Sequence, residues 1–372
     1  MSKPFQSISS ETPYTAGSTL PVLTVDVSAV VRNYCTVKSQ AGVADCAAVV
    51  KADCYGLGMN KIVPALSDAG CQTFFVAHAE EGRDLRSVLP AAKIYVFNSF
   101  MGQDLSAFHE YRLRPVLSTI EQVTLYENNK DQLDGSALHL DTGLNRYGLR
   151  ADDLPALPDD FCPSLVMSHL ACADAESHFL NKQQLGEFIK LTQRFPDSQK
   201  SLSASDGVFL GAPYCFDMVR AGAALYGVNT TPYRENQMEA VVTLSAPVLQ
   251  VTNLRAGDYV GYGASYKAHN DQRVAVLSIG YADGLPRALG NRGKAWFDHG
   301  GVSYAASIIG RISMDMTVVD ITQIPDGIIQ PGMMASVLNA DYTIDDFAVD
   351  CDTIGYEALT SLTKSRATRL YL

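Results

Sequence analysis

The sequence has no run of about eighteen apolar residues, so we expect no transmembrane helix. Its first twenty residues lack the apolar core of a signal peptide, and we expect no export. Basic residues are in the minority, with 29 Lys and Arg against 40 Asp and Glu and a net charge of -11. This balance argues against nucleic acid or an anionic membrane as a standing partner. These absences indicate a cytoplasmic protein.

The eight cysteines include no pair at C-x-x-C spacing. In an unexported chain of this size, such cysteines are expected to be free thiols that act as small core residues. His169 and Asp174 lie near Cys172, but the group lacks the four-ligand spacing of a structural zinc site. We therefore predict no metal.

The length of 372 residues predicts two domains, because single cores stop growing below this size. We expect a loosely ordered segment over 1–19, a barrel over 20–239 and a mostly β domain over 240–372. Apolar runs of strand length follow the run that ends before Lys51, near 73–78, 93–97, 114–117, 137–141, 164–169, 201–204 and 217–221. With that first run they make eight strands, and amphipathic segments separate most of them. The alternation predicts an α/β fold, a (β/α)₈ TIM-type barrel, with an open doubly wound sheet as the alternative.

Beyond about residue 240, strand-like runs cover 241–244, 248–251, 274–279 and 302–309. Turn residues such as those at 299–301 join them and leave little room for helices, so this part is predicted to be mostly β.

Lys51 stands directly after the short apolar run Ala47–Val50. A lysine at the end of a buried strand either extends its amine to water or takes part in chemistry, because burying an ammonium group is costly. In a barrel, chemistry lies just after the strand ends. Four more polar residues follow predicted strands or lie at their ends, namely Arg146, His169, Ser205 and Arg220.

If the chemistry lies at these strand ends, several other residues become candidates for the same site. Tyr55, Ser205, Gly222 and Tyr356 are candidates for holding a phosphate, although each is also an ordinary turn or core residue. Arg220 retains its proton and could donate to a neutral acceptor, or it could form a structural salt bridge. Tyr281 follows Gly280 at a strand end, where a phenol could act as acid or base or could simply belong to the core.

Eight segments together resemble, in order, the motifs of alanine racemases, enzymes that use pyridoxal 5′-phosphate (PLP). They are the segments at 47–58, 141–148, 168–169, 218–227, 262–263, 279–287, 310–315 and 356–357. The resemblance runs from about Val22 to the C-terminus.

The resemblance implies a role for each site residue. Lys51 is similar to the lysine that binds PLP and then acts as base on D-alanine, and Tyr281 to the opposite-face base, which comes from the partner subunit. His169 and Arg220 resemble residues that support Tyr281, and Arg220 also faces the pyridine nitrogen. Matches to the phosphate-binding positions are Tyr55, Ser205, Gly222, Ala223 and Tyr356. Arg146 and the backbone of Met314 match contacts to the substrate carboxylate.

This assignment agrees with the chemistry of racemisation, in which a proton leaves one face of the α-carbon and returns on the other. Two acid/base groups must therefore flank the substrate, and PLP supplies the electron sink. The resemblance implies a homodimer with shared active sites. It also implies a role in D-alanine supply for peptidoglycan, or in D-alanine catabolism.

Two residues depart from the family pattern. Ala204 stands where the family often has asparagine, which removes one hydrogen bond to the cofactor. His139 stands where several members have a carbamylated lysine that orients the carboxylate-binding arginine. Another group must therefore orient Arg146.

Three alternative functions can be compared with alanine racemisation. A decarboxylase of the same barrel family needs a glycine-rich phosphate loop and a cysteine motif, and neither is found around Cys351 or elsewhere. A non-catalytic PLP carrier with one barrel would leave the chain after Glu239 unexplained. A racemase of serine or lysine would use the same residues with a different pocket.

Overall fold

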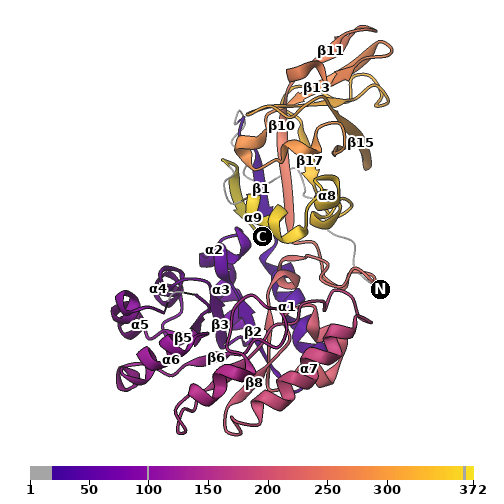
Figure 1. Cartoon of the computed structure of the whole chain (residues 1–372). Helices are drawn as coiled ribbons and strands as arrows, with labels where there is room; N and C mark the ends of the chain where they lie inside the picture. The colour runs from indigo at the N-terminus through magenta and orange to yellow at the C-terminus, as the bar shows by residue number, and fades with distance from the viewer. Residues whose placement is uncertain (1–18, 99, 363–365) are drawn as a thin grey trace. The chain divides into compact units, whose positions relative to one another are not determined.

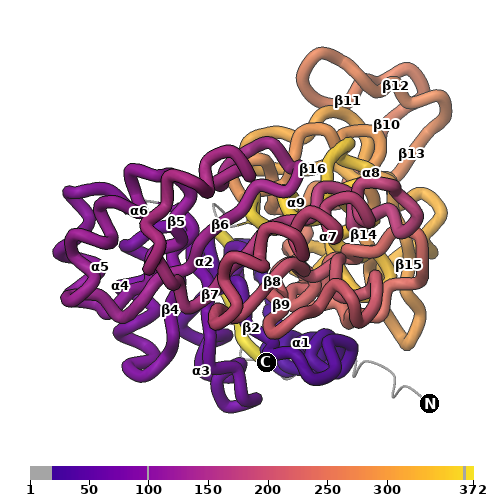
Figure 2. The backbone as a smooth tube through the Cα atoms, turned by 60° about the horizontal axis from the view of Figure 1, so that its bottom comes forward, coloured from indigo at the N-terminus to yellow at the C-terminus, as the bar shows by residue number. Residues whose placement is uncertain are grey.

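The structure is a computed structural model of the whole chain, and it describes residues 19–98, 100–362 and 366–372. The predicted loose N-terminal segment lies almost wholly outside these residues. The described chain forms two compact units: Val27–Glu239 is one, and the residues up to Asp26 together with Ala240–Leu372 form the other. Figure 2 colours the backbone by residue number, from indigo at the N-terminal end to yellow at the C-terminus, so residues 240–372 of the second unit are orange to yellow.

The unit Val27–Glu239 is built on eight parallel strands. They are β2 (Asp45–Val49), β3 (Thr73–Val76), β4 (Lys93–Val96), β5 (Arg114–Leu117), β6 (Ala137–His139), β7 (Leu165–Met167), β8 (Gln199–Ser201) and β9 (Met218–Ala221). Each pairs with the next in sequence from β2 to β8, and β9 pairs with β2. A parallel bridge between Ala204 and Arg220 joins the two ends of the sheet. The predicted TIM-type barrel is thus confirmed as a nearly closed eight-stranded barrel (Figure 1).

One helix precedes β2, and others connect most of the barrel strands. They are α1 (Val27–Ala41), α2 (Lys51–Tyr55), α3 (Met59–Asp68), α4 (Ala79–Val88), α5 (Leu105–Glu110), α6 (Ile120–Glu127) and α7 (Phe179–Thr192), with short 3₁₀ turns between them. Their apolar faces cover the strands, as in α1, where Val30, Tyr34 and Val37 are buried. Burying such side chains stabilises the fold by about 1.5–3 kcal/mol each. This packing leaves the loops after the strands as the positions for chemistry.

The second unit is mostly antiparallel β structure, as predicted. Its strands are β10 (Val242–Leu254), β11 (Tyr259–Val260), β12 (Tyr266–Lys267), β13 (Gln272–Leu277), β14 (Lys294–His299), β15 (Val302–Ile309), β16 (Thr317–Asp320), β17 (Met334–Leu338) and β18 (Thr368–Tyr371). Its main sheet closes on itself because β13 pairs with both β16 and β10. Two helices also occur, α8 (Ile344–Asp350) and α9 (Gly355–Ser361), where the sequence reading left little room for helices.

The first strand corrects the predicted domain boundary. Strand β1 (Val22–Val25) falls within the range 20–239 that we predicted for the barrel. It instead pairs antiparallel with β10 and parallel with β18, both in the second unit. The physical reason is that strand pairing follows the available sheet edge and not sequence order. The four residues of β1 are all buried there.

Within the described residues, no helix is long and apolar enough to cross a membrane.

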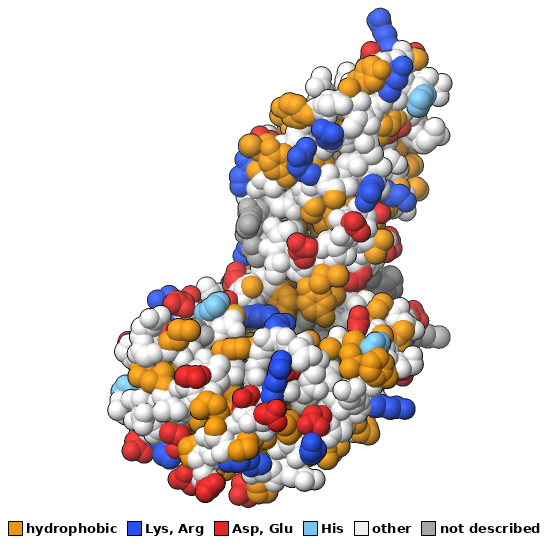
Figure 3. Space-filling model, in the orientation of Figure 1, with side chains coloured by type: hydrophobic (Ala, Val, Ile, Leu, Met, Phe, Trp, Pro, Cys, Tyr) orange, Lys and Arg blue, Asp and Glu red, His pale blue; other side chains and the backbone are white. Residues whose placement is uncertain are grey.

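Lys and Arg side chains and Asp and Glu side chains are interspersed over the face of the molecule that Figure 3 shows.

Candidate active site

Lys51 follows the end of strand β2 after one intervening residue, Val50, and begins a turn of unusual handedness. The four residues Ala52 to Tyr55 all have φ between 52° and 56°, in the left-handed region. Left-handed backbone costs an L-amino acid about 1–2 kcal/mol per residue, so this turn needs support from its surroundings. The amide of Cys54 donates to the carbonyl of Val50 at 3.0 Å, and Gly56 to Ala52 at 2.7 Å. The turn sets the directions of Lys51 at its start and Tyr55 at its end.

The surroundings of Lys51 favour a neutral amine. Burial lowers the pKa of Lys51, and the nearby Arg146 guanidinium lowers it further, while the Glu81 carboxylate acts in the opposite direction. The amine lies 6.0 Å from the centre of the Phe97 ring. A lysine with a lowered pKa is a better base and nucleophile at neutral pH.

Four of the five predicted phosphate-binding residues lie together in the barrel. The Ser205 hydroxyl accepts from the Gly222 amide at 2.8 Å and from the Ala224 amide at 3.3 Å. A Cβ atom at Gly222 would lie 2.9 Å from the Tyr55 hydroxyl, so only glycine leaves room there. Ala223 follows at the start of a 3₁₀ turn, Ala223–Tyr226. Hydroxyl groups and backbone amides that converge in this way suit an anion such as phosphate.

Arg220 on β9 is only 2% exposed, and its guanidinium bonds to neutral acceptors. It donates to the carbonyl of Ser168 at 2.6 Å, and to both the carbonyl and the hydroxyl of Ser201 at 2.9 and 2.6 Å. Burial lowers its pKa to about 10, so it remains cationic at neutral pH. The salt-bridge alternative therefore does not describe its main contacts.

His169 follows β7 and is kept neutral. Burial and the nearby Arg220 guanidinium lower the pKa of His169 to about 3. Its backbone carbonyl accepts from the Gln184 side chain at 2.9 Å, which also donates to Thr142 at 3.3 Å. A neutral imidazole next to a cation can relay a hydrogen bond without adding charge to the site.

The Arg146 segment is organised by Asp141. This carboxylate accepts from the amides of Gly143 and Asn145, each at 3.0 Å, and so shapes the loop that carries Arg146. His139, at the end of β6, is only 9% exposed. Burial, together with Arg220 and Arg146, lowers the pKa of His139 to about 4. The imidazole of His139 is therefore neutral at neutral pH and adds no charge beside Arg146.

This buried histidine should make the protein less stable in acid. The unfolded side chain binds a proton below pH 6.5, whereas the folded one does not until about pH 4. Unfolding takes up a proton within that window, so stability falls as the pH falls, by up to about 1.4 kcal/mol per pH unit. In urea unfolding between pH 7 and 5, His139→Gln should show a shallower fall than the wild type. The exposed His109→Gln is the control, and an unchanged slope in His139→Gln would contradict the assignment.

The remaining predicted residues lie in the second unit. Tyr281 and Met314 are 42% and 53% exposed. Their segments are joined by backbone bonds, from the Tyr281 amide to the Ser313 carbonyl and from Ala282 to Met314, each at 3.0 Å. Tyr356 lies in α9.

A salt bridge supports this pair of segments. Arg366 donates to the buried Asp283 carboxylate at 2.8 and 3.1 Å and to Asp315 at 2.7 Å. Asp283 closes the short turn that begins at Tyr281, and Asp315 follows Met314. The arginine thus links the segments that carry Tyr281 and Met314.

Sequence reasoning missed three residues that organise these groups, namely Glu81, Gln184 and Arg366. Each acts through hydrogen bonds to residues distant in sequence. The acidic pair at the start of α4 was the only local signal, and such pairs are common in first helical turns.

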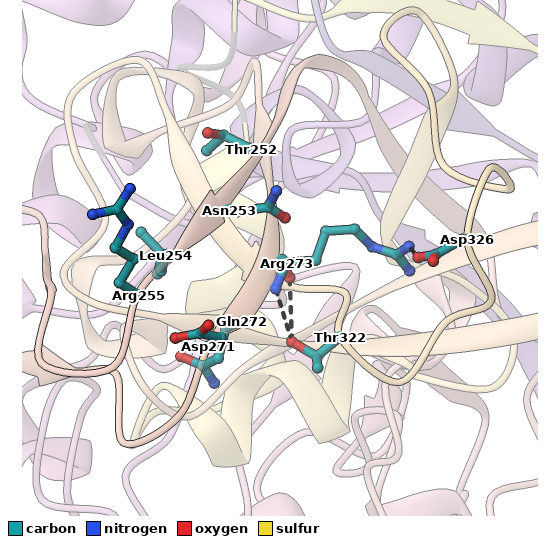
Figure 4. A pocket seen from close by; sticks show the side chains of 9 residues that line it. All are labelled: Thr252, Asn253, Leu254, Arg255, Asp271, Gln272, Arg273, Thr322 and Asp326. Carbon is teal, nitrogen blue, oxygen red and sulfur yellow. Dashed lines mark hydrogen bonds and ion pairs between the residues drawn. The ribbon is translucent and has the colours of Figure 1, made fainter.

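A separate cavity of about 620 Å³ lies in the second unit, between β10 and β13 and the segment after β16 (Figure 4). Its Arg273 already pairs with Asp326 and with backbone carbonyls.

Comparison with known proteins identifies the family. Residues 25–230 match the family described as alanine racemase, N-terminal domain, and residues 241–371 match alanine racemase, C-terminal domain. The alanine racemase of Methylobacterium nodulans is 40% identical over 358 residues, covering 94% of this chain and 95% of the relative. The chain belongs to the alanine racemase family.

Two further alanine racemases show the same extent of similarity. The one from Rhizobium meliloti is 39% identical over 355 residues, covering 91% of this chain and 94% of the relative. The crystal structure of alanine racemase from Bartonella henselae with covalently bound pyridoxal phosphate has a TM-score of 0.89 and 35% identity. It covers 95% of this chain and 100% of that one. Both units of this chain therefore belong to the family fold.

Proposed function

We propose that this chain is a PLP-dependent racemase that interconverts L-alanine and D-alanine. The observation that carries the proposal is the partly buried Lys51, whose pKa is lowered, at the start of the left-handed turn that ends at Tyr55. Membership of the alanine racemase family supports the same conclusion.

The residues of the barrel fit PLP. Lys51 would carry the cofactor, and Tyr55, Ser205, Gly222 and Ala223 would bind its phosphate, with Tyr356 as a further phosphate ligand. The room that Gly222 leaves beside the Tyr55 hydroxyl supports this assignment. When bound, PLP supplies an electron sink for the negative charge that develops at the α-carbon.

The chain's own residues would then move the proton. Lys51 Nζ takes the α-proton from D-alanine or returns it to that face. The Tyr281 phenol oxygen of the partner subunit does the same for L-alanine on the opposite face. Arg146 and the Met314 backbone bind the substrate carboxylate and fix the α-carbon between the two bases.

Arg220 and His169 would complete the site as positioning groups. Arg220, which stays cationic at neutral pH, would donate to the ring nitrogen of the cofactor and so keep that nitrogen unprotonated. The neutral His169 relays hydrogen bonding from Arg220 to the tyrosine.

Shared sites require a homodimer, which we include in the proposal. The exposure of Tyr281 and Met314 supports it, because a second copy would cover these side chains. We also place the protein in the cytoplasm, which agrees with the eight free cysteines.

The test is to incubate the purified protein and PLP with L-alanine and to measure D-alanine by chiral chromatography. Parallel reactions with L-serine and L-lysine test the alternative substrates. We expect alanine to have the highest kcat/KM. A higher value for serine or lysine would overturn the substrate assignment, and no racemisation of any of the three would overturn the function.

A further inference from the structure

Glu81 connects two loops at the carboxyl ends of neighbouring barrel strands. One carboxylate oxygen accepts from the Ala52 amide at 2.7 Å, directly after Lys51. The other accepts from the Ala77 amide at 2.7 Å and from the His78 amide at 3.3 Å, just after β3. A single side chain therefore fastens the start of the Lys51 turn to the next loop of the barrel.

The turn needs such support at both ends. Its four left-handed residues are not glycines, so the backbone there is strained. At the far end, the Asp53 carboxylate accepts from the Met59 amide at 2.7 Å. At the near end, Glu81 binds the amide that immediately follows Lys51. Loss of the Glu81 contact would free the end of the turn that directs the lysine.

Three titratable groups act electrostatically with Lys51: the Glu81 carboxylate, the Arg146 guanidinium and the neutral His169 imidazole. Glu81 is the only anion among the three. The Glu81 charge therefore opposes the effect of Arg146 on the lysine.

We propose that Glu81 is a positioning residue: its carboxylate, bonded to the Ala52 amide, holds the left-handed turn that directs Lys51 and Tyr55 toward the cofactor. This inference rests on the proposed function, in which both residues bind PLP. It assigns to Glu81 no contact with the substrate.

The test compares Glu81→Gln and Glu81→Asp with Glu80→Gln, which removes an exposed charge from the same helical turn. Both Glu81 variants should bind PLP more weakly, as measured by equilibrium dialysis, and should lose about 10- to 100-fold in kcat with little change in KM. The control should match the wild type.

The pH profile separates geometry from charge. Glu81→Gln removes the anion, which lowers the pKa of Lys51, so the acidic limb of the kcat profile should move to lower pH. Glu81→Asp keeps the charge. The acidic limb of its kcat profile should therefore stay at the wild-type pH while kcat itself falls.

A purely structural role has a different signature. Glu81→Gln would then lower Tm while PLP affinity, kcat and the pH profile stay at the values of the control, and this result would overturn the proposal. If Glu81→Gln does not fold, the proposal is tested with Glu81→Asp by the same measurements of PLP affinity, kcat and the pH profile. If the wild type proves inactive as a racemase, the proposed function fails, and PLP affinity alone still decides the role of Glu81.

Discussion

Tyr281→Phe should abolish exchange of the α-hydrogen of L-alanine with solvent while exchange in D-alanine continues. The reason is that the substitution removes the base on one face only, and Lys51 still serves the other. The two enantiomers have equal free energy, so kcat/KM for racemisation must fall equally in both directions, by about 10²- to 10⁴-fold. Exchange therefore distinguishes the two bases, whereas the racemisation rate does not.

The measurement is proton NMR of each enantiomer in D₂O with the variant holoenzyme. The control is Tyr259→Phe, which alters an exposed tyrosine of the same unit. If Tyr281→Phe slows exchange equally in D- and L-alanine, the phenol is not the base specific to the L enantiomer.

Lys51→Ala should lose both covalent attachment of PLP and racemisation, the latter by at least about 10⁴-fold, since one side chain serves both purposes. Borohydride reduction of the wild type should fix PLP to the peptide that contains Lys51, which intact-protein and peptide mass spectrometry detect. The variant should show no such adduct.

Lys61→Ala removes an exposed lysine ten positions later and is the matched control. It should keep the adduct and the activity. An adduct at the same yield in Lys51→Ala would place the cofactor on another lysine and contradict the site.

The sequence predicted the barrel well because parallel strands buried on both faces appear as short apolar runs. The prediction was least accurate at β8, where 201–204 was expected and Gln199–Ser201 forms the strand. All three of its residues are polar, and only Ser201 is buried, so no apolar run marks them. In the second unit, 241–244 and 248–251 were expected as two strand-like runs, yet the single strand β10 covers both and continues through Pro247 with a shift of register on either side.

Some residues of the site could be recognised in the sequence from their own side chains, whereas the roles of others depend on contacts with residues distant in the sequence. Lys51, Arg146 and Arg220 carry chemistry in their own side chains, and their positions near strand ends made them visible in the sequence. The roles of Glu81 and Gln184 arise from contacts with distant backbone groups, such as the Ala52 amide and the His169 carbonyl. The left-handed turn at Ala52–Tyr55 was equally hidden, because none of those four residues is a glycine.

The most direct test of an active site shared between two subunits uses hybrid dimers. Lys51→Ala and Tyr281→Phe chains with different affinity tags are co-expressed, and the dimers that carry both tags are isolated. If each site takes its lysine from one chain and its tyrosine from the other, one of the two sites in a hybrid is intact, and the hybrid should show about half the wild-type rate. A hybrid no more active than the two parent variants would show that the lysine and the tyrosine do not meet across subunits.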